Sequence, residues 1–143
     1  MSIQEQQELK KKYYDEAMRY MDNAKGYLKN AKKEGNYYSD PKYVKTACGV
    51  AYSGMLVALD CFLLLKGIEQ PRGKDRKSIE YYHNNIRKID RKMLNYLNSA
   101  YEILHLWGYY DGITKASVVK EGFSEAGKII EKINPAKQKP NHL

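Results

Sequence analysis

Apolar side chains recur every three or four residues along most of this 143-residue chain, which is the spacing of one helix face. The first such segment runs from about residue 5 to residue 34. Gly35 and Asn36 end it, because a residue that tolerates positive φ commonly follows a helix. Its apolar positions are Leu9, Tyr13, Ala17, Tyr20, Ala24, Leu28 and Ala31. The pattern predicts one long amphipathic helix.

A second helix is predicted to begin after Asp40, whose side chain can accept from free backbone N–H groups. Pro41 supplies a helical φ at the first position. The helix should run to Lys66, and Gly67 ends it.

The central part of this second helix, residues 47–65, carries one charged residue over a length close to the ~20 residues of a bilayer span. We interpret it as the most buried helix of a soluble bundle, since the amphipathic helices around it need an apolar partner. Its small residues allow a neighbouring helix to approach closely: Gly49, Ala51, Ser53 and Gly54.

A third helix is predicted from Ile79 to Trp107, and Gly108 closes it. Its apolar positions alternate steps of three and four without a break: Ile79, Tyr82, Ile86, Ile89, Met93, Leu97, Ala100, Leu104 and Trp107. A fourth helix is capped by Thr114 and ended by residues 134–135. Its inner face carries Ala116, Val119, Phe123, Ala126, Ile130 and Ile133.

Short connections between long helices force antiparallel neighbours. The sequence therefore predicts an all-α fold, an up-down-up-down four-helix bundle in one domain over residues 1–133, with a flexible tail over 134–143. The projecting aromatic end of the third helix, with Trp107, Tyr109 and Tyr110, predicts burial against a second copy in a homodimer.

The formal net charge of +8 favours acidic partners. Basic residues gather around the start of the third helix: Arg72, Lys74, Arg76, Lys77, Arg87, Lys88, Arg91 and Lys92. Tyr81 and Tyr82 lie among them, and such a face can hold phosphates while its rings stack on unpaired bases. The prediction is a site for RNA or another polyanion, and the alternative is a solvated basic face.

The two cysteines, Cys48 and Cys61, lie ~20 Å apart on one predicted helix and cannot bridge each other. With no secretory signal in the polar N-terminal residues, they indicate buried thiols in the reducing cytoplasm. His105 has no cysteine or acid near it at metal-ligand spacing, which favours a packed or surface histidine. We expect no metal and no cofactor.

Several short segments, YLKNA (27–31), GNY (35–37), YVKTA (43–47), AY (51–52) and ALDCFLLLKG (58–67), resemble the first helical hairpin of HEPN domains. The resemblance covers residues 17–67 and suggests a small bacterial member of that family. It implies a four-helix bundle, frequent homodimers and, in many members, metal-independent RNA cleavage by an Arg-x(4–6)-His pair at the dimer interface.

Only Arg76 and His83 match the spacing of that pair. Arginine can hold a phosphate bidentately, and histidine can activate a ribose hydroxyl near neutral pH. The pair lies at the start of the third helix, whereas the family motif belongs near the last helices, so a solvated arginine and a surface histidine are the alternative.

Asp60 lies within the most apolar helix, where a carboxylate needs a cationic or hydrogen-bonding partner. A structural ion pair or a tyrosine hydrogen bond meets that need, and an internal polar site is the functional alternative. Three functions remain open: a HEPN-like binding module, a ribonuclease that uses Arg76 and His83, and a scaffold that binds only protein. No catalytic motif assigns an enzyme activity.

Overall fold

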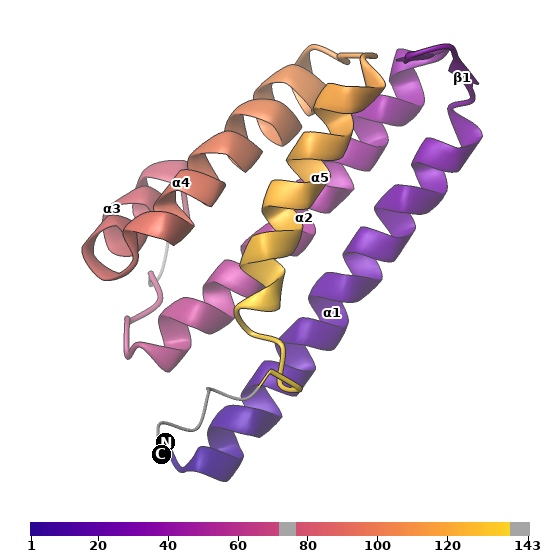
Figure 1. Ribbon diagram of the computed structural model, residues 1–143. Coiled ribbons are helices and arrows are strands. Elements are labelled where there is room, and N and C mark those ends of the chain that lie inside the picture. Colours follow the sequence, from indigo (N-terminus) through magenta and orange to yellow (C-terminus); the bar gives the residue numbers. More distant parts are fainter. Residues whose placement is uncertain (72–76, 138–143) are drawn as a thin grey trace.

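The computed structural model of the protein describes residues 1–71 and 77–137 (Figure 1). These residues form α1 (Ile3–Asn30), β1 (Lys33–Glu34), β2 (Tyr37–Tyr38), α2 (Pro41–Leu65), α3 (Ile79–Ile89), α4 (Arg91–Ala100), the π-helix η1 (Tyr101–Tyr110) and α5 (Ala116–Glu131). The prediction of an all-α chain is confirmed, apart from one small hairpin.

The helix α2 is central, since it contacts α1, η1, α5 and, sparsely, α3, whereas α4 packs on α5, η1 and α3 (Figure 1). Asp40 caps it by accepting from the Lys42 N–H at 2.9 Å, as predicted. Within the described ranges, α2 is the one helix long and apolar enough to cross a membrane by length and composition. In its most apolar window, 44% of the residues are already buried within the fold. The rest of this apolar helix stays partly exposed.

Glycines bring α2 into close contact with two neighbours, as the small residues on it predict. A Cβ built on Gly54 would lie 2.8 Å from Tyr20 Cβ of α1. On the partner side, a Cβ built on Gly108 of η1 would lie 2.5 Å from Cys48 Sγ of α2. Both distances are shorter than a normal van der Waals contact, so only glycine allows these helices to pack so tightly.

The helix α1 ends at Asn30 rather than near residue 34, because the next residues pair as a hairpin. Lys33 pairs with Tyr38 and Glu34 with Tyr37. The Tyr38 N–H donates to the Thr114 carbonyl at 2.8 Å, and the Ala116 N–H donates to the Asn36 carbonyl at 2.9 Å. The hairpin therefore fastens the α1–α2 connection to the start of α5.

This same pairing explains why Thr114 does not cap the last helix. Lys115 is the N-cap of α5 and makes no side-chain cap hydrogen bond. The Ala116 N–H, which a Thr114 cap could have bound, already donates to the Asn36 carbonyl of the hairpin. At the other end α5 stops at Glu131, although Ile133 beyond it is still buried. Residues 138–143 of the predicted tail lie outside the described residues.

The prediction of one unbroken helix from Ile79 to Trp107 is wrong, because the chain breaks at Asp90. Asp90 is extended (φ −151°, ψ 102°), and its carboxylate accepts from the Met93 N–H at 3.0 Å to cap α4. An Asp side chain offers the backbone this local alternative to helical bonding. The apolar spacing hides the break, because Ile86 before it and Met93 after it are both buried.

The predicted end at Gly108 is also wrong, since η1 continues to Tyr110. Gly108 is needed inside this π-helix for its contact with Cys48, so it does not act as a stop. π-Helical turns are rare and are frequently found at functional sites.

The close approach at Gly108 predicts that Gly108→Ala will lower the free energy of unfolding by about 1–3 kcal/mol, since the added methyl group overpacks the contact with Cys48. Gly26→Ala is the matched control, because a Cβ there meets nothing within 4 Å. It should stabilise α1 by about 0.5–1 kcal/mol. Urea unfolding followed by circular dichroism measures both, and equal effects would contradict the packing role of Gly108.

Candidate functional site

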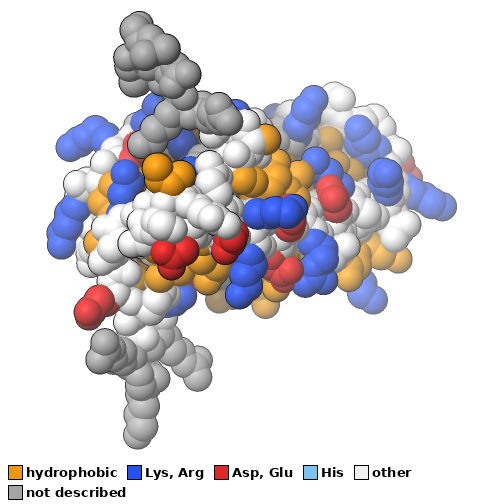
Figure 2. Space-filling view, turned by 90° about the horizontal axis from the view of Figure 1, so that it is seen from below, with side chains coloured by type: hydrophobic (Ala, Val, Ile, Leu, Met, Phe, Trp, Pro, Cys, Tyr) orange, Lys and Arg blue, Asp and Glu red, His pale blue; other side chains and the backbone are white. Residues whose placement is uncertain are grey.

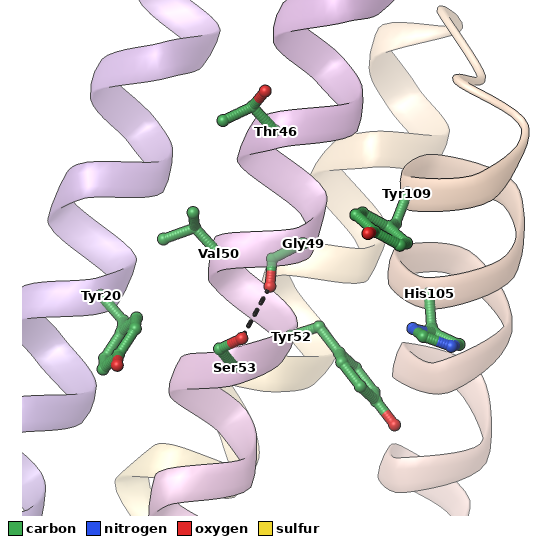
Figure 3. Close-up of a pocket in the computed structure, with 8 residues that line it drawn as sticks. All are labelled: Tyr20, Thr46, Gly49, Val50, Tyr52, Ser53, His105 and Tyr109. Atoms are coloured by element: carbon green, nitrogen blue, oxygen red, sulfur yellow. Dashed lines mark hydrogen bonds between the residues drawn. The ribbon is translucent and has the colours of Figure 1, made fainter.

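A groove of about 490 Å³ opens between α1, α2 and η1 (Figure 3). We call it the aromatic groove; its lining residues are Tyr20, Thr46, Gly49, Val50, Tyr52, Ser53, His105 and Tyr109. Tyr20 reaches it from α1, and the rings of His105 and Tyr109 reach it from η1 on the other side of α2 (Figure 3). None of the lining side chains is an acid, a lysine or an arginine.

The wall formed by η1 is a column of stacked rings. His105 lies between Tyr101 and Tyr109, with ring centroids 5.2 Å and 5.8 Å away and planes tilted by 26° and 13°. Tyr52 of α2 meets His105 at 4.7 Å between centroids. Gly49 leaves room for the Tyr109 ring, because a Cβ there would lie 2.8 Å from Tyr109 Cδ1. The rings of η1 and Tyr52 therefore form one continuous aromatic cluster along this wall.

The groove is electrically neutral near pH 7. Burial lowers the pKa of His105 below its ordinary value of 6.5, so the imidazole is mostly uncharged at that pH. Burial, and then the proximity of Tyr101, raises the pKa of Tyr52 to about 12. The hydroxyls of Ser53 and Thr46 donate to the carbonyls of Gly49 and Lys42, at 3.1 Å and 3.2 Å. The polar atoms of the floor are thus largely satisfied, which favours an apolar or aromatic ligand.

The helix η1 also carries exposed aromatic side chains besides those that line the groove. Trp107 is 38% exposed, Tyr109 48% and Tyr110 61%. These are the residues whose projection the sequence predicts. The groove itself, which brings Tyr20, Tyr52 and His105 together, is not predicted from the sequence. The four-residue spacing of Tyr101, His105 and Tyr109 is a signal that could have placed these three rings together.

The predicted basic face is only partly brought together. Arg72, Lys74 and Arg76 lie outside the described residues. The other basic side chains on the two helices are exposed, and we call them the α3–α4 basic cluster: Arg87, Lys88, Arg91 and Lys92. Asp90 separates the first two from the last two, so they do not share one continuous helix. Elsewhere, at the end where α1 begins, acidic and basic side chains are intermingled (Figure 2).

Tyr82 is buried, so its ring cannot stack on a base, and its hydroxyl is bound to Asp60. The Tyr82 hydroxyl donates to Asp60 Oδ1 at 2.8 Å, and Lys77 Nζ lies 3.1 Å from the same oxygen. Asp60 has both structural partners that its position requires, and its side chain is 21% exposed rather than fully buried. Burial, and then the Asp60 charge, raises the pKa of Tyr82. The contact links α2 to the start of α3.

The Arg76–His83 pair lies partly outside the described residues, because only His83 is among them. His83 is half-buried on α3, and its Nε2 has no hydrogen-bond partner within the described part of the chain. Cys48 and Cys61 are both free and buried, and burial raises the pKa of each thiol to about 12. Both thiols are therefore protonated and unreactive. Across residues 1–71 and 77–137, no three His, Cys, Asp or Glu side chains gather as metal ligands.

Fold and site together define an all-α protein with an uncharged aromatic groove. The chain belongs to the family described as Domain of unknown function (DUF5618), whose model matches residues 12–135. It is similar to a solved structure described as a protein of unknown function from Dyadobacter fermentans. The two share 40% identity over 87% of this chain and 95% of that chain, with a TM-score of 0.76. No curated protein matches the sequence.

The contact between Tyr82 and Asp60 predicts that Tyr82→Phe will lower the free energy of unfolding by about 1–2 kcal/mol, because a hydrogen bond to a partly buried carboxylate is lost. Lys77→Ala should cost less than about 1 kcal/mol, since the ion pair is partly exposed. Chemical denaturation of the two variants tests this order, and a larger loss for Lys77→Ala would overturn it.

Proposed function

We propose that the protein is a HEPN-like interaction module that forms a homodimer through the aromatic groove and binds a polyanion at the α3–α4 basic cluster. In this four-helix bundle, α1 and α2 are the first hairpin. The third helix is bent and consists of α3, α4 and η1, and α5 is the fourth helix. Support for this division comes from the apolar stripe that runs from Tyr82 to Leu104, buried on both sides of the bend and partly buried at Ile89 beside it.

The observation that carries the proposal is the absence of charge in the aromatic groove of a chain with a net charge of +8. Two copies with the same net charge repel each other, and this repulsion is weakest where the contact surface carries no charged side chain. The groove and its exposed rings supply such a face, and aromatic side chains are favoured at the centres of protein interfaces.

The outer surface of α2 supports the same partner. Val50, Leu56 and Val57 are apolar but only partly buried. They pack against the core, and their exposed parts would add to the apolar surface that a second copy covers. A homodimer would bury them together with the rings of His105 and Tyr109. The protonated, buried thiols of Cys48 and Cys61 support a cytoplasmic location for this module.

A second function, polyanion binding, rests on the α3–α4 basic cluster. All four side chains are exposed, and none makes an ion pair with a residue of the described ranges. Arg91 and Lys92 stand in the first turn of α4, where positive charge opposes the helix dipole. An arriving phosphate would relieve that repulsion. RNA is the polyanion that the HEPN resemblance favours.

For the homodimer, Tyr109→Glu should raise the dissociation constant by at least about tenfold, because it places a charge in the uncharged groove. Ile3→Glu is the matched control: Ile3 is 80% exposed and lies about 25 Å along α1 from Tyr20. Sedimentation velocity of both variants measures the effect. A monomeric wild-type protein at high concentration would refute the homodimer.

Acid provides a second test of the same interface. In the monomer His105 already has a lowered pKa, and burial in a dimer would lower it further. The neutral imidazole therefore favours the dimer above pH 6.5, and this contribution is lost as the pH falls through the lowered pKa. The dimer should weaken on acidification in the wild type and much less in His105→Gln.

For the polyanion, Arg87→Ala combined with Arg91→Ala should weaken binding to labelled oligouridylate and reduce the salt slope of the affinity by about 1.4, since each lost contact to a single strand contributes about 0.7. Lys11→Ala with Arg19→Ala removes the same charge from side chains that are already in ion pairs. Fluorescence anisotropy over a salt series compares the two. Equal losses would mean that only net charge matters.

A further inference from the structure

A long groove also runs between α1 and α5, on a face distinct from the aromatic groove. Both helices pack on α2 but touch each other only sparsely. Two cavities of about 470 and 300 Å³ lie between them, and a third of about 390 Å³ continues past the end of α1 along the hairpin, lined only by residues from Lys25 to Tyr38. The first two share Lys25, Lys120 and Phe123, and the last two share Lys25, Leu28, Lys33 and Tyr38. They therefore form one continuous trough, which we call the lysine groove.

The floor of the lysine groove is apolar. It is formed by Met18, Met21, Leu28, Tyr38, Phe123 and Ile130. Methionine side chains are flexible and adapt to the shape of a bound apolar surface. Gly127 lies on the α5 side, and a Cβ built there meets nothing within 4 Å. The floor thus leaves room for a partner to come close to the α5 backbone.

The rim of the lysine groove is almost purely cationic. Its lysines are Lys25, Lys29, Lys32, Lys33, Lys120 and Lys128. Lys128 is paired with Glu125 at 2.9 Å, while the other five make no ion pair with any residue that the structure describes. The one acid in the lining, Glu131, is bound to Lys137 at 3.2 Å. The lining of the lysine groove therefore carries positive charge that is unpaired within the described part of the chain, and its one acidic side chain is already in an ion pair.

The dimensions suit a helix. From Met18 to Lys32 the α1 side of the groove spans roughly 20 Å, at 1.5 Å per residue. An apolar floor between charged rims is the geometry in which an amphipathic helix lays its apolar face into a groove. Such a helix of about four turns would cover the floor completely.

We propose that the lysine groove is the docking site for an acidic amphipathic helix of a partner protein. Its apolar face packs on Met18, Met21 and Phe123, and its flanking carboxylates meet Lys25, Lys29 and Lys120. Charge complementarity selects this occupant. The chain itself offers none: its helices α1 and α5 carry lysines among their acids, and residues 138–143 contain Lys139 and no acidic side chain.

Single-stranded nucleic acid fits the groove less well than a helix does. Binding of unpaired bases relies on exposed aromatic faces. Phe123 is only 8% exposed and Tyr38 is half-buried, so the floor offers packing surface rather than a stacking platform. The lysines could bind phosphate groups, but unpaired bases would leave the apolar floor uncovered. The aliphatic side chains of an amphipathic helix would cover it.

The experiment uses a designed, fluorescein-labelled peptide of about 16 residues, with leucines on one helical face, glutamates beside them and alanines elsewhere. A scrambled peptide of the same composition is the comparison. The first peptide should bind the full-length protein more tightly than the second by at least about tenfold. It should shift the amide NMR signals of residues along α1 and α5, and α-helical circular dichroism should increase on binding.

Gly127→Leu should weaken this binding by at least about tenfold, because the new side chain fills the groove without a clash inside the protein. Gly26→Leu is the matched control: it adds the same side chain to an open helical position that does not line the groove. It should change the affinity by less than about twofold. Lys25→Glu with Lys120→Glu should abolish binding of the acidic peptide, and Ile3→Glu, which adds a charge at an exposed position outside the groove, should leave it unchanged.

Three results would overturn the proposal. The first is equal binding of the designed and scrambled peptides, which would mean attraction by net charge alone. The second is binding that Gly127→Leu does not weaken while circular dichroism shows the variant to be folded. The third is oligouridylate that shifts the same NMR signals and displaces the peptide at lower concentration, which would assign the groove to nucleic acid.

Discussion

The close packing of other helices against α2 is the constraint on which the rest of the structure depends. Gly54 admits Tyr20 of α1, and Gly108 lets η1 come down onto Cys48. At these two contacts a methyl group would force the helices apart, because protein interiors leave no room for it. These contacts set the distances of α1 and η1 from α2, and therefore the width of the aromatic groove between them.

Two local departures from regular α-helix determine which side chains lie together on the surface of the second half of the chain. Asp90 interrupts the helix and caps its continuation, so the cations on either side of it belong to two helices. The π-helix then brings Tyr101, His105 and Tyr109 into one stacked column against Tyr52. Both features cost regular backbone hydrogen bonding, and both occur beside surfaces that could receive a partner.

Charge is distributed unevenly between the grooves of this strongly basic protein. The aromatic groove carries no lysine, arginine or acid, whereas five rim lysines of the groove between α1 and α5 have no ion-pair partner among the described residues. An uncharged face and a cationic face select different partners, since desolvation favours apolar contact at one and Coulomb attraction favours acids at the other. The family match and the solved relative establish shared ancestry and fold, and their descriptions name no activity.

The helices, their buried faces and the start of α2 at Asp40 and Pro41 follow from the sequence, because periodicity and capping act between residues close in the chain. The sequence also shows that Asp60 needs a partner, because its neighbours in the helix are apolar. Only the fold shows that Tyr82 and Lys77 are that partner. Tertiary contacts decided the passage of η1 through Gly108 and the early end of α1. The break at Asp90 is a local cap, and the apolar spacing hides it because Ile86 and Met93 are buried on either side. Both grooves are also tertiary, since each joins helices far apart in the sequence. Apolar spacing reports which side of a helix is buried, and it contains no information about which neighbour buries it.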